Sequence, residues 1–279
     1  MSGITFFKTE DLDEIKDFYI DKIGMNLWLD QGGCIILKHG NMLLGFCESD
    51  DKETEGVITF FYREREKVDE KYEQFNDTAR EKPKVREKFD IYNFFAEDIE
   101  ERTIEFQTFL HPVKPYMEGE QLLKERRSVR DYKDKEVSKE ILSEIFETCR
   151  FSPTSCNTQG YYFILIYDRE IIEFMASRRG SSSEPIQEAP MAVAICCDPD
   201  ETLRPEQDGC IAAYHFILSA WNHGLGTCWI AAMDRDDVKE KLDIPNHHYV
   251  ATVTPLGFPK DIPKTPSRNS RESFIKKEL

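Results

Sequence analysis

The sequence Ile4-Thr5-Phe6-Phe7 recurs further along the chain as Ile58-Thr59-Phe60-Phe61. Both copies are rich in β-branched and aromatic residues, which favours a β-strand. Each copy is followed by a charged segment with apolar residues at helical spacing, and then by short runs with the pattern of strands. The repeat therefore predicts two tandem units, each with the order strand, helix and three strands.

The apolar positions of the two expected helices are Leu12, Ile15, Phe18, Tyr19 and Ile23 in the first copy, and Val68, Tyr72 and Phe75 in the second. The strand candidates after them are Met25–Asp30, Cys34–Lys38, Met42–Cys47, Val85–Phe89, Ile91–Ala96 and Thr103–Phe109. Glycine pairs between the first three runs are typical of turns. We assign residues 1–112 to this first domain.

The sequence His111-Pro112-Val113-Lys114-Pro115 interrupts the repeat. Two prolines this close together are typical of a semi-rigid linker, so we predict a linker over 113–119 and a second domain over 120–279. The helix candidates of that domain are 118–126, 138–150, 169–178, 206–223 and 234–242, and its strand candidates are Tyr161–Tyr167, Ala192–Cys197 and Tyr249–Leu256. Helices flanking a mixed sheet predict an α+β fold. The length of 279 residues agrees with two domains at roughly 150 residues each.

The chain carries a net charge of −16, from 37 basic and 53 acidic side chains. Such a surface repels phosphate backbones and anionic lipids, so we expect neither nucleic acid nor membrane as a partner. No stretch approaches the ~20 apolar residues of a membrane helix, and the N-terminal residues lack the pattern of a signal peptide. We therefore expect a cytoplasmic protein.

Eight cysteines are present, and none forms a Cys-x-x-Cys pair. A zinc ribbon or an iron–sulfur site needs clustered thiolates, so neither is expected. In a cytoplasmic chain of this size, the cysteines are expected to be reduced, buried thiols.

The paired units resemble the glyoxalase, bleomycin-resistance and extradiol-dioxygenase superfamily, the vicinal oxygen chelate fold. The best local match runs from Phe94 to Phe106 and is similar to the final hairpin of that family, whose last strand carries a metal-ligand glutamate. Here that glutamate is Glu105, while Ile99 and Glu101 stand where the family has proline and glycine in the turn.

The resemblance implies a divalent metal held by one side chain from each of four strands. The other three positions fall within Ile4–Phe6, Val57–Thr59 and Leu44-Gly45, which offer no good ligand beside Glu105. We therefore expect a metal-free domain. Its phenylalanine-rich strands suit a small apolar ligand, although the same residues also suit a sheet core.

Two pieces of the second half have the residue types of a ligand site. The first is Arg126-Arg127-Ser128-Val129-Arg130-Asp131-Tyr132, where three guanidinium groups and a hydroxyl within five residues could bind a phosphate or could be solvated surface. The second is Phe151–Gly160, where Asn157 and Gln159 could bond the edge of a heterocycle or form an ordinary helix-to-strand loop.

Two further pieces follow. The sequence Gly224-Leu225-Gly226-Thr227-Cys228-Trp229-Ile230-Ala231-Ala232 lacks the third glycine of a dinucleotide fingerprint and follows a helix, so it is not a Rossmann motif. Its glycines instead let backbone approach a ligand closely. The last piece is Thr254–Lys260, followed by Lys264 and Arg268. Between them, His247 and His248 are interpreted as loop residues whose side chains point apart.

In this order, the four pieces resemble the nitroreductase family of FMN enzymes, from about Glu120 to the C-terminus. The resemblance implies that the ribityl-phosphate is bound by Arg126, Arg127, Ser128 and Arg130. It also implies that Lys264 or Arg268 is a further ligand of the phosphate. It implies that Asn157 and Gln159, with the backbone of Pro153, Thr154 and Ser155, contact the flavin from the neighbouring subunit or near the dimer seam. It also implies that Trp229, Ile230 and Ala231 bring backbone N–H groups toward flavin N5.

The same resemblance implies a homodimer with bound FMN that passes electrons from NAD(P)H to a small electron-poor acceptor, a nitroaromatic or a quinone, in a ping-pong reaction. No catalytic side chain and no metal are expected, because the flavin carries the hydride. Two alternatives remain. One is a flavin-binding protein without turnover, acting as a redox sensor or flavin store, and the other is a protein that sequesters small molecules through its N-terminal domain.

Overall fold

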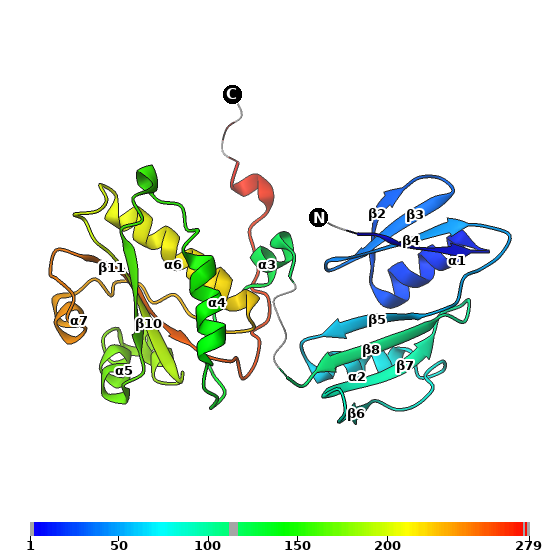
Figure 1. Cartoon of the computed structure of the whole chain (residues 1–279), viewed down its shortest axis with the longest axis horizontal. Coiled ribbons are helices and arrows are strands. Elements are labelled where there is room, and N and C mark those ends of the chain that lie inside the picture. The colour runs from blue at the N-terminus through cyan, green and yellow to red at the C-terminus, as the bar shows by residue number, and fades with distance from the viewer. Residues whose placement is uncertain (1–2, 112–116, 276, 278–279) are drawn as a thin grey trace. The chain divides into compact units, whose positions relative to one another are not determined.

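The computed structural model describes residues 3–111, 117–275 and 277. It divides into two compact units, Met1–Glu118 and Gly119–Leu279, and each is described by itself (Figure 1). Most of the linker predicted over 113–119 falls on residues outside the described ranges.

The first unit contains two repeats, residues 3–56 and 57–111, each with its own four-stranded sheet. The first repeat consists of β1 (Thr5–Thr9), α1 (Leu12–Asp17) with a π-helical turn (Phe18–Ile23), β2 (Asn26–Asp30), β3 (Cys34–His39) and β4 (Met42–Glu48). The second consists of β5 (Val57–Tyr62), α2 (Arg65–Gln74), β6 (Lys84–Arg86), β7 (Ile91–Glu97) and β8 (Thr103–Phe109). The strand orders are β1-β4-β3-β2 and β5-β8-β7-β6, and in each sheet the first strand pairs parallel with the last.

The expected strand Val85–Phe89 is shorter in the structure, because β6 ends at Arg86. The chain turns there, with the amide of Phe89 donating to the carbonyl of Arg86 at 3.0 Å. Phe89 itself is 60% exposed.

One hydrophobic core joins the two repeats. The side chains of Ile15 and Tyr19 from the first repeat and of Phe75 and Phe106 from the second are fully buried in it. Phe18 contacts Phe75 edge to face across the boundary, with the ring centroids 6.0 Å apart. The repeats therefore bury their apolar faces against each other, which neither could do alone.

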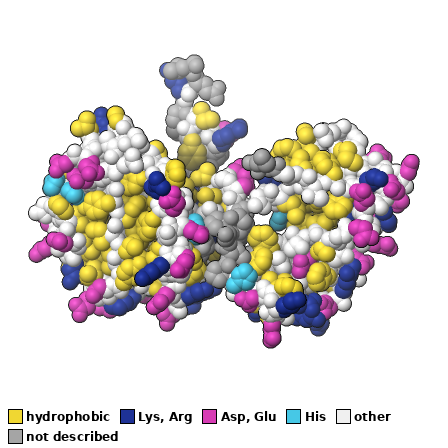
Figure 2. All heavy atoms as spheres, in the orientation of Figure 1, with side chains coloured by type: hydrophobic (Ala, Val, Ile, Leu, Met, Phe, Trp, Pro, Cys, Tyr) yellow, Lys and Arg dark blue, Asp and Glu magenta, His cyan; other side chains and the backbone are white. Residues whose placement is uncertain are grey.

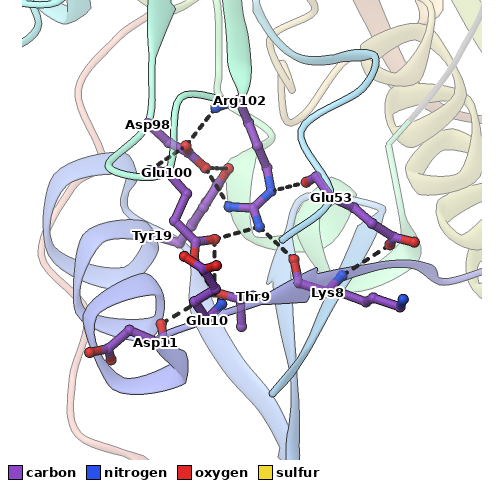
Figure 3. A network of polar contacts seen from close by, with 9 residues as sticks. All are labelled: Lys8, Thr9, Glu10, Asp11, Tyr19, Glu53, Asp98, Glu100 and Arg102. Atoms are coloured by element: carbon purple, nitrogen blue, oxygen red, sulfur yellow. Dashed lines mark hydrogen bonds and ion pairs between the residues drawn. The ribbon is translucent and has the colours of Figure 1, made fainter. Parts of the chain in front are cut away.

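A buried polar network also joins the repeats (Figure 3). Its centre is Arg102, which is 1% exposed and pairs with the carboxylates of Asp98 and Glu100. The Arg102 guanidinium also donates to the backbone carbonyls of Lys8 and Glu53 in the first repeat, both at 2.7 Å. Every charged group at this point has a partner, as burial of a charge requires.

The first repeat completes this network. The Tyr19 hydroxyl donates to Asp98 at 3.0 Å, and burial beside this carboxylate raises the pKa of Tyr19, so the hydroxyl stays protonated. Glu100 accepts from the Thr9 hydroxyl and from the Glu10 amide, both at 2.8 Å. Burial alone raises the pKa of Glu100, but these hydrogen bonds and Arg102 lower it overall.

The turn between β7 and β8 keeps a glycine-like conformation without glycine. Glu101 has φ +69°, a left-handed value that costs a residue with a side chain about 1–2 kcal/mol. The Asp98 side chain compensates by accepting from the amides of Glu100 and Arg102, at 2.9 and 2.8 Å.

The prediction that all cysteines are free is wrong for one pair. Cys34 and Cys47 form a disulfide between neighbouring strands β3 and β4. The antiparallel register places the two residues directly opposite each other, on the same face of the sheet. The other six, Cys149, Cys156, Cys196, Cys197, Cys210 and Cys228, are free, and Cys156 is exposed rather than buried.

The second unit consists of three layers. Its elements are α3 (Gly119–Glu125), α4 (Lys139–Cys149), β9 (Tyr161–Ile166), α5 (Arg169–Ala176), β10 (Met191–Cys197), α6 (Pro205–Asn222), α7 (Asp236–Lys241) and β11 (Tyr249–Leu256). The central strand β10 is buried along its whole length and pairs antiparallel with β9 and β11.

Alternate residues of β10 face the two outer layers. Met191, Val193 and Ile195 pack against α4 and α6, whereas Ala192 and Ala194 face α5 and α7 (Figure 1). A strand covered on both faces by helices needs a continuous apolar run, which the sequence of β10 supplies. Helices α4 and α5 begin at Ser138 and Asp168, whose side chains accept from backbone amides of the first turn.

Helices of the kind that cross membranes do not occur among the described residues, since none combines the necessary length and apolarity. On the face shown in Figure 2, acidic side chains are spread over both units, in keeping with the excess of carboxylates in the sequence.

Candidate functional site

The arginine-rich segment after α3 pairs with the glycine-rich segment after α6. Ser128 forms a parallel bridge with Thr227, and the Val129 amide donates to the Thr227 carbonyl at 2.9 Å. Gly226 permits this approach, because a Cβ added there would lie only 2.6 Å from the Val129 side chain. Two pieces predicted to bind one cofactor are therefore in contact.

A cavity of about 380 Å³ lies beside this pairing. Its described lining is Arg130, Arg179, Ser181, Ser182, Cys228, Trp229, Ile230 and Ala231. Of the residues predicted to bind flavin, Arg130 and the run from Trp229 to Ala231 are thus brought together.

The backbone of this run is held from behind by two buried threonines of β11. The Thr252 hydroxyl donates to the Ile230 carbonyl and accepts from its amide, and Thr254 does the same for Cys228. These hydrogen bonds involve alternate residues of the run. Successive backbone amides of an extended chain point in opposite directions, so we infer that the amides of Trp229 and Ala231 point away from the threonines and face the cavity.

Arg130 and Arg179 bring positive charge to the cavity, whereas the predicted phosphate ligands Arg126, Arg127 and Ser128 are not in its described lining. The Arg126 Nε atom is buried and has no hydrogen-bond partner among the described residues. Arg126 and Arg130 both lie close enough to Cys228 to act on its thiol electrostatically. Burial raises the pKa of Cys228, and the two arginines oppose that shift without reversing it. The thiol therefore stays protonated and is no nucleophile at neutral pH.

Arg127 is held by hydrogen bonds within the unit. Its guanidinium donates to the backbone carbonyls of Lys124 and Arg126 and to the Thr265 hydroxyl. It thereby ties the C-terminal segment to the end of α3. Lys264 is next to Thr265 along the chain and is exposed, as is Arg268, whose guanidinium donates to the Ser267 carbonyl at 3.3 Å.

The loop with the remaining predicted flavin contacts lies elsewhere in the unit. The Ser155 amide donates to the carboxylate of Asp208, in the first turn of α6, at 3.0 Å. The glycine-rich run follows the last turn of the same helix. An 18-residue helix is about 27 Å long. Within one chain, the loop with Pro153, Thr154, Ser155, Asn157 and Gln159 therefore lies far from the glycine-rich run and the cavity beside it. Figure 1 shows the length of α6.

This loop is tightly turned and outward-facing. Asn157 and Gln159 are exposed and have φ values of +58° and +57°. The Gln159 amide donates to the Thr154 hydroxyl at 3.0 Å, and its side chain donates to the Asn157 carbonyl at 3.3 Å.

Four residues of the cavity were not among those predicted to bind flavin: Cys228, Arg179, Ser181 and Ser182. Ser181 and Ser182 lie on a 3₁₀ turn after α5, Gly180–Ser182, and Arg179 directly precedes this turn. The buried hydroxyl of Ser183 fixes the turn by accepting from the Arg179 amide. Two arginines followed by a glycine and three serines are the signal that could have indicated an anion site here.

The histidine pair was also interpreted incorrectly in one respect. The side chains of His247 and His248 do not point apart, because their ring centroids are 4.6 Å apart. Both residues do lie in the loop before β11.

Comparisons with known proteins identify the second unit. Residues 123–192 and 175–258 match the model of the nitroreductase family. A protein of Methanothermobacter thermautotrophicus, provisionally named NADH dehydrogenase/NAD(P)H nitroreductase, is 30% identical over 150 residues, which are 51% of this chain and 78% of the relative. An Archaeoglobus fulgidus protein with the same provisional name is 31% identical, over 49% of this chain and 82% of the relative.

Solved structures agree. A nitroreductase family protein of Clostridium difficile 630 has a TM-score of 0.53 and 26% identity, covering 58% of this chain and 99% of its own. An FMN-dependent nitroreductase of Clostridium difficile R20291 has a TM-score of 0.50 and 29% identity, covering 57% of this chain and 96% of its own.

These similarities define an oxidoreductase, as predicted. The chain belongs to the nitroreductase family, through a domain that covers about half of its length.

Proposed function

We propose that the cavity of the second unit binds FMN and that the protein passes electrons from NAD(P)H to a small electron-poor acceptor, a nitroaromatic or a quinone, by a ping-pong mechanism. FMN and a nicotinamide donor accord with the family and with relatives such as the FMN reductase [NAD(P)H] of Bacillus subtilis. Bound FMN would supply hydride chemistry that no protein side chain provides.

The observation that carries this proposal is the buried Arg126 Nε, which has no hydrogen-bond partner in the described part of the chain. Arg126 and Arg130 both act electrostatically on the thiol of Cys228, which lines the cavity. A buried donor without a partner costs roughly 1–3 kcal/mol, more when it is charged, so such a group calls for an anionic ligand. Arginine suits phosphate because its donors match two oxygens at once. We assign Arg126 and Arg130 to the anionic part of the cofactor, with Lys264 or Arg268 as a further cation.

The other residues have roles in positioning and shielding. The inferred direction of the Trp229 and Ala231 amides gives two fixed donors toward the flavin ring, which would favour charge developing there. The Trp229 side chain, 38% exposed, forms part of the wall that limits access of water. We assign to Arg127 and Ser128 the task of fixing the segment through their contacts with Thr265 and Thr227.

We further propose a homodimer with shared sites. The loop with Asn157 and Gln159 and the cavity lie at opposite ends of α6, so one chain cannot bring both to one flavin. A second copy that places its loop against the cavity would complete the site. Mixing a chain that carries Asn157→Ala and Gln159→Ala with one that carries Arg126→Ala and Arg130→Ala should restore part of the lost activity, whereas a monomeric site would show no rescue.

The cofactor assignment is tested by the double variant Arg126→Ala, Arg130→Ala. Each arginine should lose at least one charge-assisted hydrogen bond of roughly 1.5–3 kcal/mol, which together weakens FMN binding by about 10²–10⁴-fold. The matched control is Arg80→Ala, Arg150→Ala, which removes the same charge from two exposed ion pairs. Full FMN content in the first variant would contradict the assignment.

Turnover separates the enzyme from a flavin-binding sensor or store. Steady-state oxidation of NAD(P)H should depend on the acceptor and give parallel double-reciprocal lines, the pattern of a ping-pong reaction. A protein that binds FMN but oxidises no NAD(P)H with any nitroaromatic or quinone would favour the sensor or store.

For the first unit we propose a metal-free domain of the vicinal oxygen chelate type. Glu105, the one candidate ligand, accepts from the Thr59 hydroxyl at 2.8 Å and from the Asn93 amide, so it is occupied within its sheet. At the corresponding place of the first repeat, Gly45 lies under the Phe6 ring, which a Cβ there would meet at 2.2 Å.

One face of the first sheet favours binding of an apolar ligand as a second activity. The register places Phe6, Gly45, Ile36 and Leu29 in one row across the sheet, and Phe6 and Leu29 are 44% and 42% exposed. Calorimetry of the full chain with aromatic small molecules should show binding that Phe6→Ser weakens. An absence of binding across a broad panel would remove this second activity.

A further inference from the structure

A cluster of histidine and aspartate lies at one end of the sheet in the second unit. Asp198 directly follows β10, and His247 and His248 directly precede β11. Because these strands are antiparallel, with Cys197 opposite Tyr249, the three residues meet at the same end. One possible ligand atom from each lies within 4.8 Å of those of the other two.

The distance between two of the three ligand atoms is longer than a usual hydrogen bond and fits two ligands of one metal ion. The distance from His248 Nε2 to Asp198 Oδ1 is 3.4 Å, which exceeds the 2.7–3.2 Å of usual N–H···O bonds. Two atoms that each lie about 2.1 Å from one tetrahedral ion are about 3.4 Å apart. His247 Nε2 is likewise 3.4 Å from a carboxylate oxygen of Asp200, which adds negative charge at the rim.

Neighbouring groups orient two of the three side chains. His248 Nδ1 is bonded to the Tyr162 hydroxyl at 2.9 Å, which leaves Nε2 for an ion. Asp198 Oδ1 accepts from the Asp200 amide at 2.8 Å, and the Asp198 amide donates to the Gly160 carbonyl at 2.8 Å. Metal-binding histidines and carboxylates in proteins are usually held by outer contacts of this kind.

We propose that Asp198, His247 and His248 form a binding site for a divalent first-row transition-metal ion such as Zn²⁺, with water in the remaining positions. Two imidazoles and a carboxylate are the donor types that such ions prefer, whereas Mg²⁺ and Ca²⁺ prefer oxygen alone. The side chain of His248 is 12% exposed and that of His247 is 56% exposed, so the site combines a fixed ligand with an open approach. None of the three residues lines the cavity with Arg130, so this site is independent of the proposed flavin site.

The test is a calorimetric titration of the full chain with Zn²⁺, without a histidine tag and after treatment with a chelator. We expect one ion per chain in the unaltered protein. His248→Gln and Asp198→Asn should abolish this binding, and His247→Gln should weaken it by more than the roughly 10–100-fold loss typical of an outer contact. Tyr162→Phe, which removes such a contact, should weaken it by about 10–100-fold.

The matched control is His223→Gln. His223 Nε2 lies 3.3 Å from a carboxylate oxygen of Glu144, an equivalent spacing, but among the described residues this pair has no third ligand. The variant should therefore bind Zn²⁺ like the unaltered protein. Because the side chain of His247 is exposed, His247→Gln should fold like the unaltered protein. Circular dichroism checks the folding of this variant. No stoichiometric uptake, or uptake that His247→Gln and His248→Gln both leave unchanged, would overturn the proposal.

Discussion

Replacement of Arg102 by methionine should strongly destabilise the first unit. The side chain is almost fully buried, and its guanidinium pairs with Asp98 and Glu100 while donating to two carbonyls of the first repeat. Arg102→Met would leave both carboxylates buried and uncompensated. Breaking a buried ion pair in this way typically costs 3–5 kcal/mol.

The control is Arg80→Met in the same unit. Arg80 pairs with Glu97, but the two side chains are 49% and 41% exposed, so this pair should contribute only about 0–1 kcal/mol. A compensated variant that adds Asp98→Asn and Glu100→Gln to Arg102→Met removes the uncompensated charges. It should recover part of the lost stability.

Urea unfolding followed by hydrogen exchange measures this effect in each unit separately. With a denaturant slope of about 1–3 kcal/mol per molar urea, Arg102→Met should lower the midpoint of peptides from 3–111 by at least about 1 M. Peptides from 119–275 should keep their midpoint. If Arg102→Met shifts the first unit no more than Arg80→Met, the network does not hold the two repeats together.

Three further predictions concern stability and the proposed site. Gly226→Ala should lower the stability by about 1–3 kcal/mol and reduce the flavin content, because the added Cβ meets the Val129 side chain. Gly119 has open space around it, so Gly119→Ala should change neither the stability nor the flavin content. Thermal unfolding measures the stability, and flavin absorbance measures the flavin content. Because the pKa of Glu100 is lowered, its stabilising contribution is present above pH 4.5 and is lost as the pH falls below that value. Acid should therefore destabilise the first unit of the unaltered protein more than the first unit of the Glu100→Gln variant. Asp208→Ala removes the acceptor of the Ser155 amide and should loosen the loop at 153–159. The variant should retain less flavin as a dimer, although the cavity of its own chain stays intact. Unchanged flavin retention would count against shared sites.

The order of elements in the first unit could be predicted from the repeat, because each strand and helix carries its own local pattern. The buried position of Arg102 could not. It lies in a run with four acidic residues, Glu97-Asp98-Ile99-Glu100-Glu101-Arg102-Thr103, whose composition is typical of a solvated turn. Only the pairing of the two repeats encloses it.

The disulfide shows the same limit. Cys34 and Cys47 lie within two apolar strands, and their pairing follows from the register of β3 against β4. A one-residue shift in that register would place them on opposite faces. No local feature of the sequence determines this register with a precision of one residue.

In the second unit, the contact between residues 126–130 and 226–231 was predictable from motif order, since each piece has recognisable chemistry. Arg179 could not be assigned to the cavity, because only the packing of α5 against the sheet brings the turn after it to this place. The sequence likewise did not predict that the loop at 153–159 and the cavity lie at opposite ends of α6.

The visible absorption spectrum of the purified full chain tests the central claim most directly. The account predicts a flavin band at about 450 nm and release of FMN, identified by mass, when the protein is denatured. A colourless protein that also fails to take up added FMN would contradict the account, and the first unit would then become the place to look for its function.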